Sequence, residues 1–192
     1  MNTMNPHALS WFELPAVDLD RVYPYLVPSL TDPALAPACV PVGHGVWAQL
    51  WADEEKGNEI VHTVVTPERL KAEGVTPEEA HRRALDNLDR FAEDDPNLSI
   101  QVLGAVGMPV HFLLYSDHPR AAACLRLPGL YEEACERLGT TEVCAVVPQR
   151  ESLVLLPKRD RAYRERIVGK LRELEADAKN PISFALFELT AD

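Results

Sequence analysis

The chain has 192 residues, of which 19 are basic and 30 acidic, and its formal net charge is −11. This negative charge argues against non-specific binding of DNA, RNA or anionic lipid, because such binding requires clustered cations that release counterions from phosphates. An apolar fraction of 46% and a charged fraction of 26% are ordinary for a globular domain, and a chain of this length can bury a core without a metal or a disulfide.

Residues 1–43 differ from the rest of the chain in their proline content. Seven prolines lie there, and each one fixes φ and removes a backbone hydrogen-bond donor. We therefore expect a proline-rich N-terminal arm of irregular conformation, with a short helix near Asp18–Leu26, followed by an α+β domain over residues 44–192. The arm also carries aromatic and aliphatic side chains, which indicates that it packs against this chain or against a partner.

A regular pattern begins after the arm. Alternating apolar residues predict a hairpin of two strands, Val46–Ala52 and Glu59–Val65. A threonine followed by a proline at 66–67 predicts the start of a short helix. Thr76 and Glu79 then form a capping-box pattern, which predicts the start of a longer amphipathic helix.

Two further units repeat this order of hairpin and helix. The expected strands are Ser99–Leu103 with Val110–Ser116, and Val143–Val147 with Leu153–Leu156. The expected helical segments are Arg120–Leu138, split at 128–129 by a proline and a glycine, and Asp160–Ala178, and a final strand follows at Ile182–Leu189. Three hairpin–helix units and a last strand predict an α+β fold, with a mainly antiparallel sheet whose helices cover one face.

Residues His62–Pro157 carry a series of motifs that resemble one known family. In chain order they are VTPERL, TPEEAHRRALDNLDRF, PVHFLLYSD, GLYEEA and VCAVVPQRESLVLL. With these motifs the chain resembles the YtpQ-like family of bacterial proteins of unknown function. The resemblance implies a cytoplasmic bacterial protein without an established enzymatic activity, and it supplies no catalytic residues.

Motifs for catalysis, metals and cofactors are missing from the sequence. There is no G-x-S-x-G elbow, and the six histidines form no H-x-x-x-H or H-E-x-x-H pair. We therefore expect no catalytic residue, no metal and no cofactor. The four cysteines show no framework spacing, and we expect them to be small buried side chains in a reducing compartment. No apolar run reaches the roughly 18 residues of a membrane helix, and no signal-peptide pattern begins the chain, so the expected location is the cytoplasm.

The strand Val46–Ala52 supplies the first candidate surface for a protein partner. Its alternation places Trp47 and Trp51 on one face. If that face is exposed, the two tryptophans are suitable anchors for a partner, and otherwise a helix or the arm covers them. Gln149 and Arg150, in the turn of the last hairpin, are further candidates for contact with a partner.

A cluster of cations supplies the second candidate surface. Seven basic residues lie between 158 and 172, and Arg159 and Arg166 are the members that we single out as partner-binding. The cluster suits an acidic partner, or the acidic segment 86–95 of a second copy of the chain. The alternative is a solvated helix face with intrahelical pairs such as Arg161–Glu165, each of which contributes only a few tenths of a kcal/mol.

These observations predict a non-enzymatic cytoplasmic protein-interaction module, such as an adaptor, a chaperone-like factor or an assembly component, with a protein as partner and with homo-oligomers possible. A small acidic secretion-type chaperone also suits the size and charge. A third alternative is an enzyme whose site is assembled from dispersed polar residues, namely His62, His111, Asp117, His118 and Arg150. An interaction module would expose Trp47 or Trp51, whereas an enzyme would bring at least two of those polar groups together.

Overall fold

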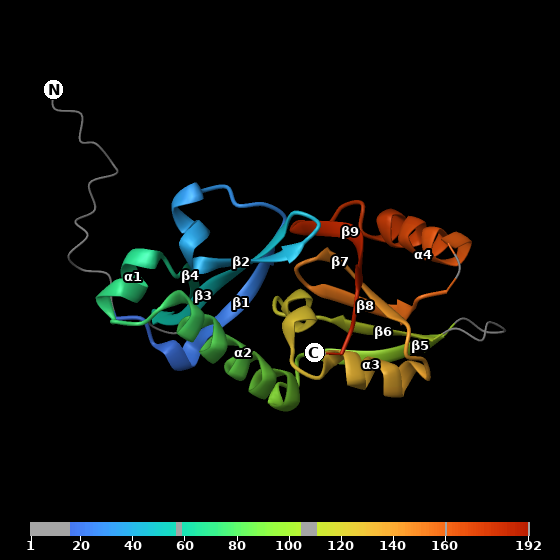
Figure 1. Cartoon of the computed structure of the whole chain (residues 1–192), viewed down its shortest axis with the longest axis horizontal. Coiled ribbons are helices and arrows are strands. Elements are labelled where there is room, and N and C mark those ends of the chain that lie inside the picture. Colours follow the sequence, from blue (N-terminus) through green and yellow to red (C-terminus); the bar gives the residue numbers. More distant parts are fainter. Residues whose placement is uncertain (1–15, 57–58, 105–110, 160, 192) are drawn as a thin grey trace, which may run out of the picture.

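The computed structural model describes residues 16–56, 59–104, 111–159 and 161–191 (Figure 1). They form two antiparallel sheets with helices packed against them, so the predicted α+β class is confirmed. The strands are divided between a four-stranded sheet A and a five-stranded sheet B, and this division was not predicted from the sequence.

Sheet A is built around the long strand β3 (Val46–Lys56). β1 (Val22–Val27) pairs with one side of β3. β2 (Cys39–Gly43) and β4 (Glu59–Val64) pair with successive parts of its other side. The predicted hairpin of β3 and β4 is therefore confirmed.

The expected irregular conformation of the arm is wrong for much of the part that the structure describes. β1 and β2 come from the arm and hydrogen-bond to β3. Asp18–Leu26 contains only one short 3-10 helix, η1 (Leu19–Arg21), before β1 begins, and a second, η2 (Pro33–Ala38), precedes β2. Pro24 and Pro41 are tolerated because each lies in a strand that pairs with only one neighbour.

Sheet B contains the other two hairpins and the last strand. Its order is β5-β6-β8-β7-β9, and every neighbouring pair is antiparallel. The strands are β5 (Ser99–Gly104), β6 (His111–Ser116), β7 (Val143–Gln149), β8 (Ser152–Pro157) and β9 (Pro181–Glu188). All five were predicted as strands, with boundaries that differ by a residue or two.

The helices begin and end close to the predicted positions. They are α1 (Pro67–Ala72), α2 (Pro77–Asp94), η3 (Ala122–Arg126), α3 (Leu130–Leu138) and α4 (Arg161–Leu174). Thr66 caps α1 and Thr76 caps α2, since each hydroxyl accepts a backbone N–H of the first turn. None of these described helices has the length and apolar character needed to cross a bilayer.

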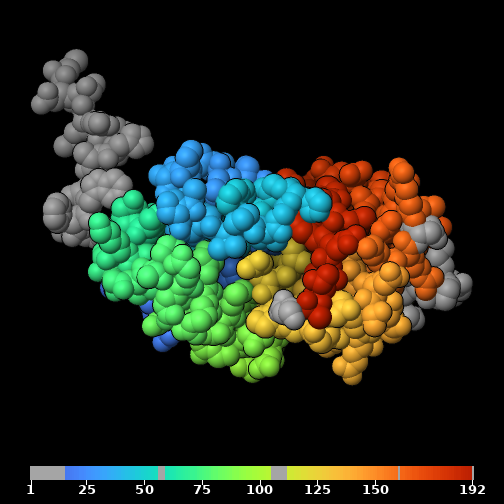
Figure 2. Space-filling model, in the orientation of Figure 1, coloured from blue at the N-terminus to red at the C-terminus, as the bar shows by residue number. Residues whose placement is uncertain are grey.

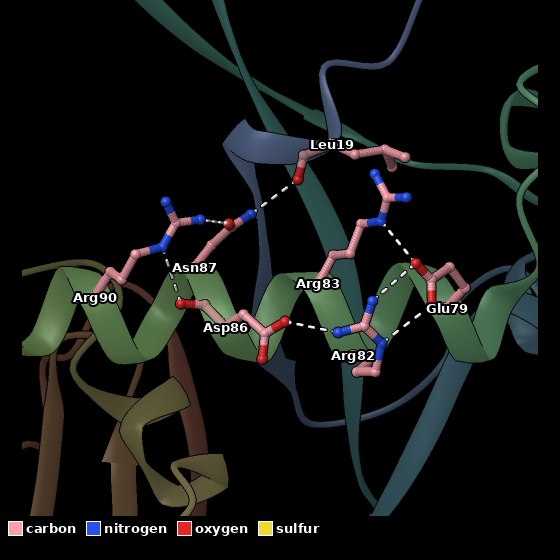
Figure 3. Close-up of polar contacts among 7 residues, drawn as sticks. All are labelled: Leu19, Glu79, Arg82, Arg83, Asp86, Asn87 and Arg90. Atoms are coloured by element: carbon pink, nitrogen blue, oxygen red, sulfur yellow. Dashed lines mark hydrogen bonds and ion pairs between the residues drawn. The ribbon is translucent and has the colours of Figure 1, made fainter.

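Only half of the capping box that was predicted for α2 is formed. The amide of Glu79 donates to the Thr76 hydroxyl at 3.2 Å. The Glu79 carboxylate instead accepts hydrogen bonds from Arg82 and Arg83 on the exposed side of the helix (Figure 3). These two ion pairs lower the pKa of Glu79 to about 2.

The helices do not cover a single face of sheet B, which corrects the expectation. α3 packs on the face that carries Ala145 and Leu155, whereas α4 packs on the face that carries Cys144 and Val146. Figure 1 shows α3 and α4 on opposite sides of the sheet. Both faces are therefore buried, which agrees with the nearly continuous apolar sequence of β7 and β8.

One apolar core joins the two sheets. It contains Leu26 and Ala48 of sheet A, Leu113 and Leu155 of sheet B, and Leu88 of α2. The turn between β2 and β3 also reaches β9, where the ring of His44 lies 5.0 Å from the ring of Phe187. In Figure 2 this turn, in cyan, lies directly against β9, in red. Sheets A and B therefore pack as one body.

Candidate functional site

Trp51 of β3 and Arg150 of the β7–β8 turn meet between the two sheets. The guanidinium carbon of Arg150 lies 5.4 Å from the centre of the Trp51 ring and 5.6 Å from the centre of the Tyr25 ring. The two rings are themselves 5.4 Å apart. Tyr25 is buried, whereas Trp51 and Arg150 are half-buried. The guanidinium therefore rests against an aromatic wall, an arrangement that cation–π attraction favours.

Backbone hydrogen bonds hold the Arg150 turn in this position. The amide of Arg150 donates to the carbonyl of Asn180, and its carbonyl accepts from the amide of Ala122, each at 3.1 Å. The turn is thus fastened to the segment before β9 and to η3. A residue of the same strand holds the Trp51 side chain: its indole N–H donates to the side-chain oxygen of Gln49 at 3.0 Å.

Asp53 is the acidic centre of the same region. It lies opposite His62 in the register of β3 and β4, and Nδ1 of His62 is 2.7 Å from Oδ1 of Asp53. Its other carboxylate oxygen accepts a hydrogen bond from Nη2 of Arg120. The side chains of Asp53 and Arg120 are each 8% exposed, whereas that of His62 is 40% exposed. The Arg120 guanidinium also stacks on Tyr23, 3.7 Å from the ring centre.

The hydroxyl of Tyr25 lies in the field of all these charges. Burial raises the pKa of Tyr25, the positive charges of Arg120 and Arg150 oppose that rise, and the negative charge of Asp53 adds to it. The hydroxyl therefore remains protonated at neutral pH. Within the described residues, no group accepts a hydrogen bond from this hydroxyl, from Nε of Arg120 or from Nε of Arg150, and all three atoms are buried.

The arrangement has more positive than negative charge. Asp53 balances Arg120, and Arg150 forms no ion pair with any side chain that the structure describes. A buried donor without an acceptor costs about 1–3 kcal/mol. The site is therefore chemically suited to an anionic acceptor, and a carboxylate matches the planar fork of a guanidinium.

The structure separates the predicted partner-binding residues. Trp47 is half-buried and shares the face of Trp51. Gln149 points elsewhere, since its amide donates to the carboxylate of Glu175 at 2.7 Å. Arg159 precedes α4 and Arg166 lies within it, and each guanidinium is 5.9 Å from the centre of the Tyr163 ring.

Of the dispersed polar residues that were predicted for an enzyme, only some lie near one another. The ring of His62 lies 6.0 Å from the ring of Tyr25. Nδ1 of His118 accepts the backbone N–H of Arg120 at 3.1 Å, and burial together with the charge of Arg120 lowers the pKa of His118. Asp117 is exposed and accepts a hydrogen bond from Ser116. The side chain of His111 lies outside the described residues.

Sequence reasoning missed three residues of the site, Tyr25, Asp53 and Arg120. The pairing of Asp53 with His62 has a signal in the sequence, because both lie in one hairpin whose register follows from its turn. Arg120 has no such signal, since it is 67 residues away from Asp53. No group of three metal-ligating side chains occurs among the residues described.

Comparison of the chain with protein-family models, with curated proteins and with solved structures finds no match.

Proposed function

We propose that the protein is a protein-interaction module that binds an acidic group of its partner at a Trp51 surface, formed by Trp47, Trp51 and Arg150 over Tyr25. The single observation that carries this proposal is the position of Arg150. Its guanidinium lies against two aromatic rings, and among the described residues its Nε has no acceptor and no carboxylate pairs with it. Tryptophan and arginine are the residue types that most often dominate the binding energy of protein interfaces.

The geometry of β3 extends this surface. Trp47 and Trp51 are four residues apart in one strand, so their side chains share a face about 13 Å apart. Arg150 covers part of the Trp51 ring. The ring of His62, at one margin of the surface, is partly exposed to solvent. A partner can thus contact an apolar anchor and a cation at once. A carboxylate is a better ligand than nucleic acid here, because the net charge of −11 repels a polyanion.

Quantitative affinity purification tests the proposal. The tagged protein and its Arg150→Gln and Trp51→Ser variants are used as baits in the native cell extract, and captured proteins are quantified by mass spectrometry. We expect a specific partner whose recovery falls at least tenfold with either variant. Arg82→Gln is the matched control, because Arg82 carries the same charge on the exposed side of α2 (Figure 3). The proposal fails if no captured protein depends on both Arg150 and Trp51 while circular dichroism shows that the variants are folded.

An enzyme is the second candidate, and the Asp53–His62 pair favours it. A buried carboxylate holds Nδ1 of a half-exposed imidazole, which is how a general base is oriented. Among the described residues no hydroxyl or thiol is hydrogen-bonded to His62, so the attacking group would be water or part of the substrate. A panel of ester, phosphoester and amide substrates tests this candidate. Hydrolysis that His62→Gln abolishes and Arg82→Gln leaves unchanged would support it, and a panel without turnover would reject it for these bonds.

A further inference from the structure

A groove separates α4 from β9, on the face of sheet B opposite α3. Its volume is about 600 Å³. Its lining consists of three apolar side chains, three arginines and one glutamate: Val168, Phe184, Leu186, Arg161, Arg164, Arg172 and Glu165. The arginines project from one face of the helix because their positions repeat at helical spacing. The groove shares no residue with the Trp51 surface.

Two of the three arginines are available to a ligand. Arg161 is paired with Glu165 at 2.6 Å, which confirms the predicted intrahelical pair. Arg164 and Arg172 form no ion pair within the part of the chain that the structure describes. Arg172 stacks on the groove wall, with its guanidinium 5.6 Å from the centre of the Phe184 ring. The groove therefore offers two cations from α4 beside apolar side chains of β9.

The spacing of these cations matches an extended peptide. Arg164 and Arg172 are eight residues apart in α4, which corresponds to about 12 Å along the helix. Side chains at positions i and i+4 of an extended chain are about 13 Å apart and point the same way, and the side chain at i+2 lies between them on that same side. Carboxylates at i and i+4 would reach the two guanidinium groups, while an apolar side chain at i+2 would contact Phe184 and Leu186.

We infer that this groove binds an acidic peptide segment of the pattern acid–x–apolar–x–acid. Charge complementarity supports this occupant, because the groove is locally cationic in a protein whose net charge is −11. The same net charge repels nucleic acid, and a polyphosphate would leave the apolar side chains of β9 without a contact. The occupant is a segment of a partner protein, and the inference does not depend on the proposed role of Trp51 and Arg150.

Fluorescence anisotropy with a defined probe tests the inference. The probe is a fluorescein-labelled peptide of sequence Gly-Glu-Ala-Phe-Ala-Glu-Gly, titrated with the full chain. We expect saturable binding that weakens at least tenfold in the Arg164→Gln/Arg172→Gln variant and at high salt. The matched control is Arg82→Gln/Arg137→Gln, which removes the same charge from two exposed ion pairs elsewhere and should leave the affinity unchanged.

Peptide variants and one small acid identify the ligand class. Replacing both glutamates by glutamine, or the phenylalanine by alanine, should each weaken binding at least fivefold. Equal binding of the glutamine peptide overturns the inference, as does an absence of binding at the highest soluble protein concentration. Competition by phenylacetate at the same concentration as unlabelled peptide would also overturn it, because the groove would then select a small acid. Loss of binding in Arg150→Gln, with Arg164→Gln/Arg172→Gln unaffected, would place the peptide at the Trp51 surface instead.

Discussion

Asp53 and Arg120 form a buried ion pair between sheet A and the loop that leads into η3. They are 67 residues apart in sequence, and neither side chain is more than 8% exposed. The same guanidinium is stacked on Tyr23 of β1 and lies 4.9 Å from the centre of the Phe91 ring of α2. Arg120 therefore links three elements, and its charge is compensated mainly by Asp53.

Removing Arg120 should destabilise the fold severely. Arg120→Met leaves the Asp53 carboxylate buried with only the partly exposed His62 as partner, and losing one member of a buried pair typically costs about 3–5 kcal/mol. Urea unfolding followed by circular dichroism measures the change. The double variant Asp53→Asn/Arg120→Met should recover part of the loss, because no charge is then left unpaired.

The exposed ion pair of Arg82 and Glu79 provides the control for this prediction. Arg82→Met should change the free energy of unfolding far less than Arg120→Met, since exposed ion pairs contribute little. If Arg120→Met proved as mild as Arg82→Met, the buried pair would not have the structural role assigned to it.

Asn87 joins α2 to the start of sheet A. Its side-chain amide donates to the carbonyls of Leu19 and Val22, each at 2.8 Å. Its oxygen accepts from Arg90, and Figure 3 shows this contact together with the one to Leu19. Asn87 is 4% exposed, and Asn87→Ala removes a donor from both carbonyls, of which that of Leu19 still accepts the backbone N–H of Val22. Because a buried acceptor that loses its donor costs about 1–3 kcal/mol, we expect a loss of stability in that range. Urea unfolding should show a loss of this size. Asp89→Ala, at an exposed position two residues further along α2, should change the stability little.

Local patterns predicted most elements of the fold correctly. The hairpins β3–β4, β5–β6 and β7–β8 follow from alternating or continuous apolar runs separated by polar turns, and the start of α2 follows from the cap at Thr76. β1 and β2 were missed because Pro24 and Pro41 look like breakers of a strand. A single sequence does not reveal that both strands lie at a sheet edge, where a proline loses no hydrogen bond.

The candidate site was predicted far less completely than the fold. Trp51 and Arg150 were each singled out, yet on separate surfaces, because their contact depends on how sheet A packs against the turn of sheet B. The importance of Arg120 was also missed, since a long-range ion pair has no periodicity and no local spacing.

Two of the four thiols should be unreactive in the native protein. Cys124 and Cys144 are buried as predicted, and burial raises the pKa of Cys124 to about 12 and that of Cys144 to about 11. Cys39 and Cys135 are only half-buried, which corrects the expectation that all four cysteines are buried. Because the thiolate is the reacting species, an aromatic disulfide reagent should modify Cys124 and Cys144 only after the protein is unfolded.

A double variant isolates the two buried thiols. Cys39→Ser/Cys135→Ser should give no colour with the reagent in the native state and two equivalents of thiol in denaturant. Rapid reaction of the native double variant would contradict the burial of Cys124 and Cys144.

Stability should fall as the pH is lowered through the range in which histidines titrate. His81 lies on α2, and its Nε2 is 3.1 Å from the carbonyl of Ala38, to which the neutral ring donates when the proton is on that nitrogen. Burial lowers the pKa of His81, and the charge of Arg126 lowers it further, against the opposing effects of the Ala38 carbonyl and Glu78. In the unfolded chain the group returns to its ordinary pKa of about 6.5, so below that pH the unfolded state binds more protons than the native state.

The contribution of His81 to the free energy of unfolding should therefore be fully present above about pH 7, and it should decrease as the pH falls below about 6.5. His118 contributes in the same direction, because burial also lowers its pKa. The ion pairs of Glu79 stabilise the fold fully above its ordinary pKa of 4.5, and this contribution is lost as the pH falls from 4.5 to about 2. Urea unfolding at about pH 7.5 and about pH 5.5 measures the histidine effect, and His81→Gln should reduce the difference between the two conditions. If neither His81→Gln nor His118→Gln changed the difference in the free energy of unfolding between the two pH values, the fold would hold neither ring in its neutral form.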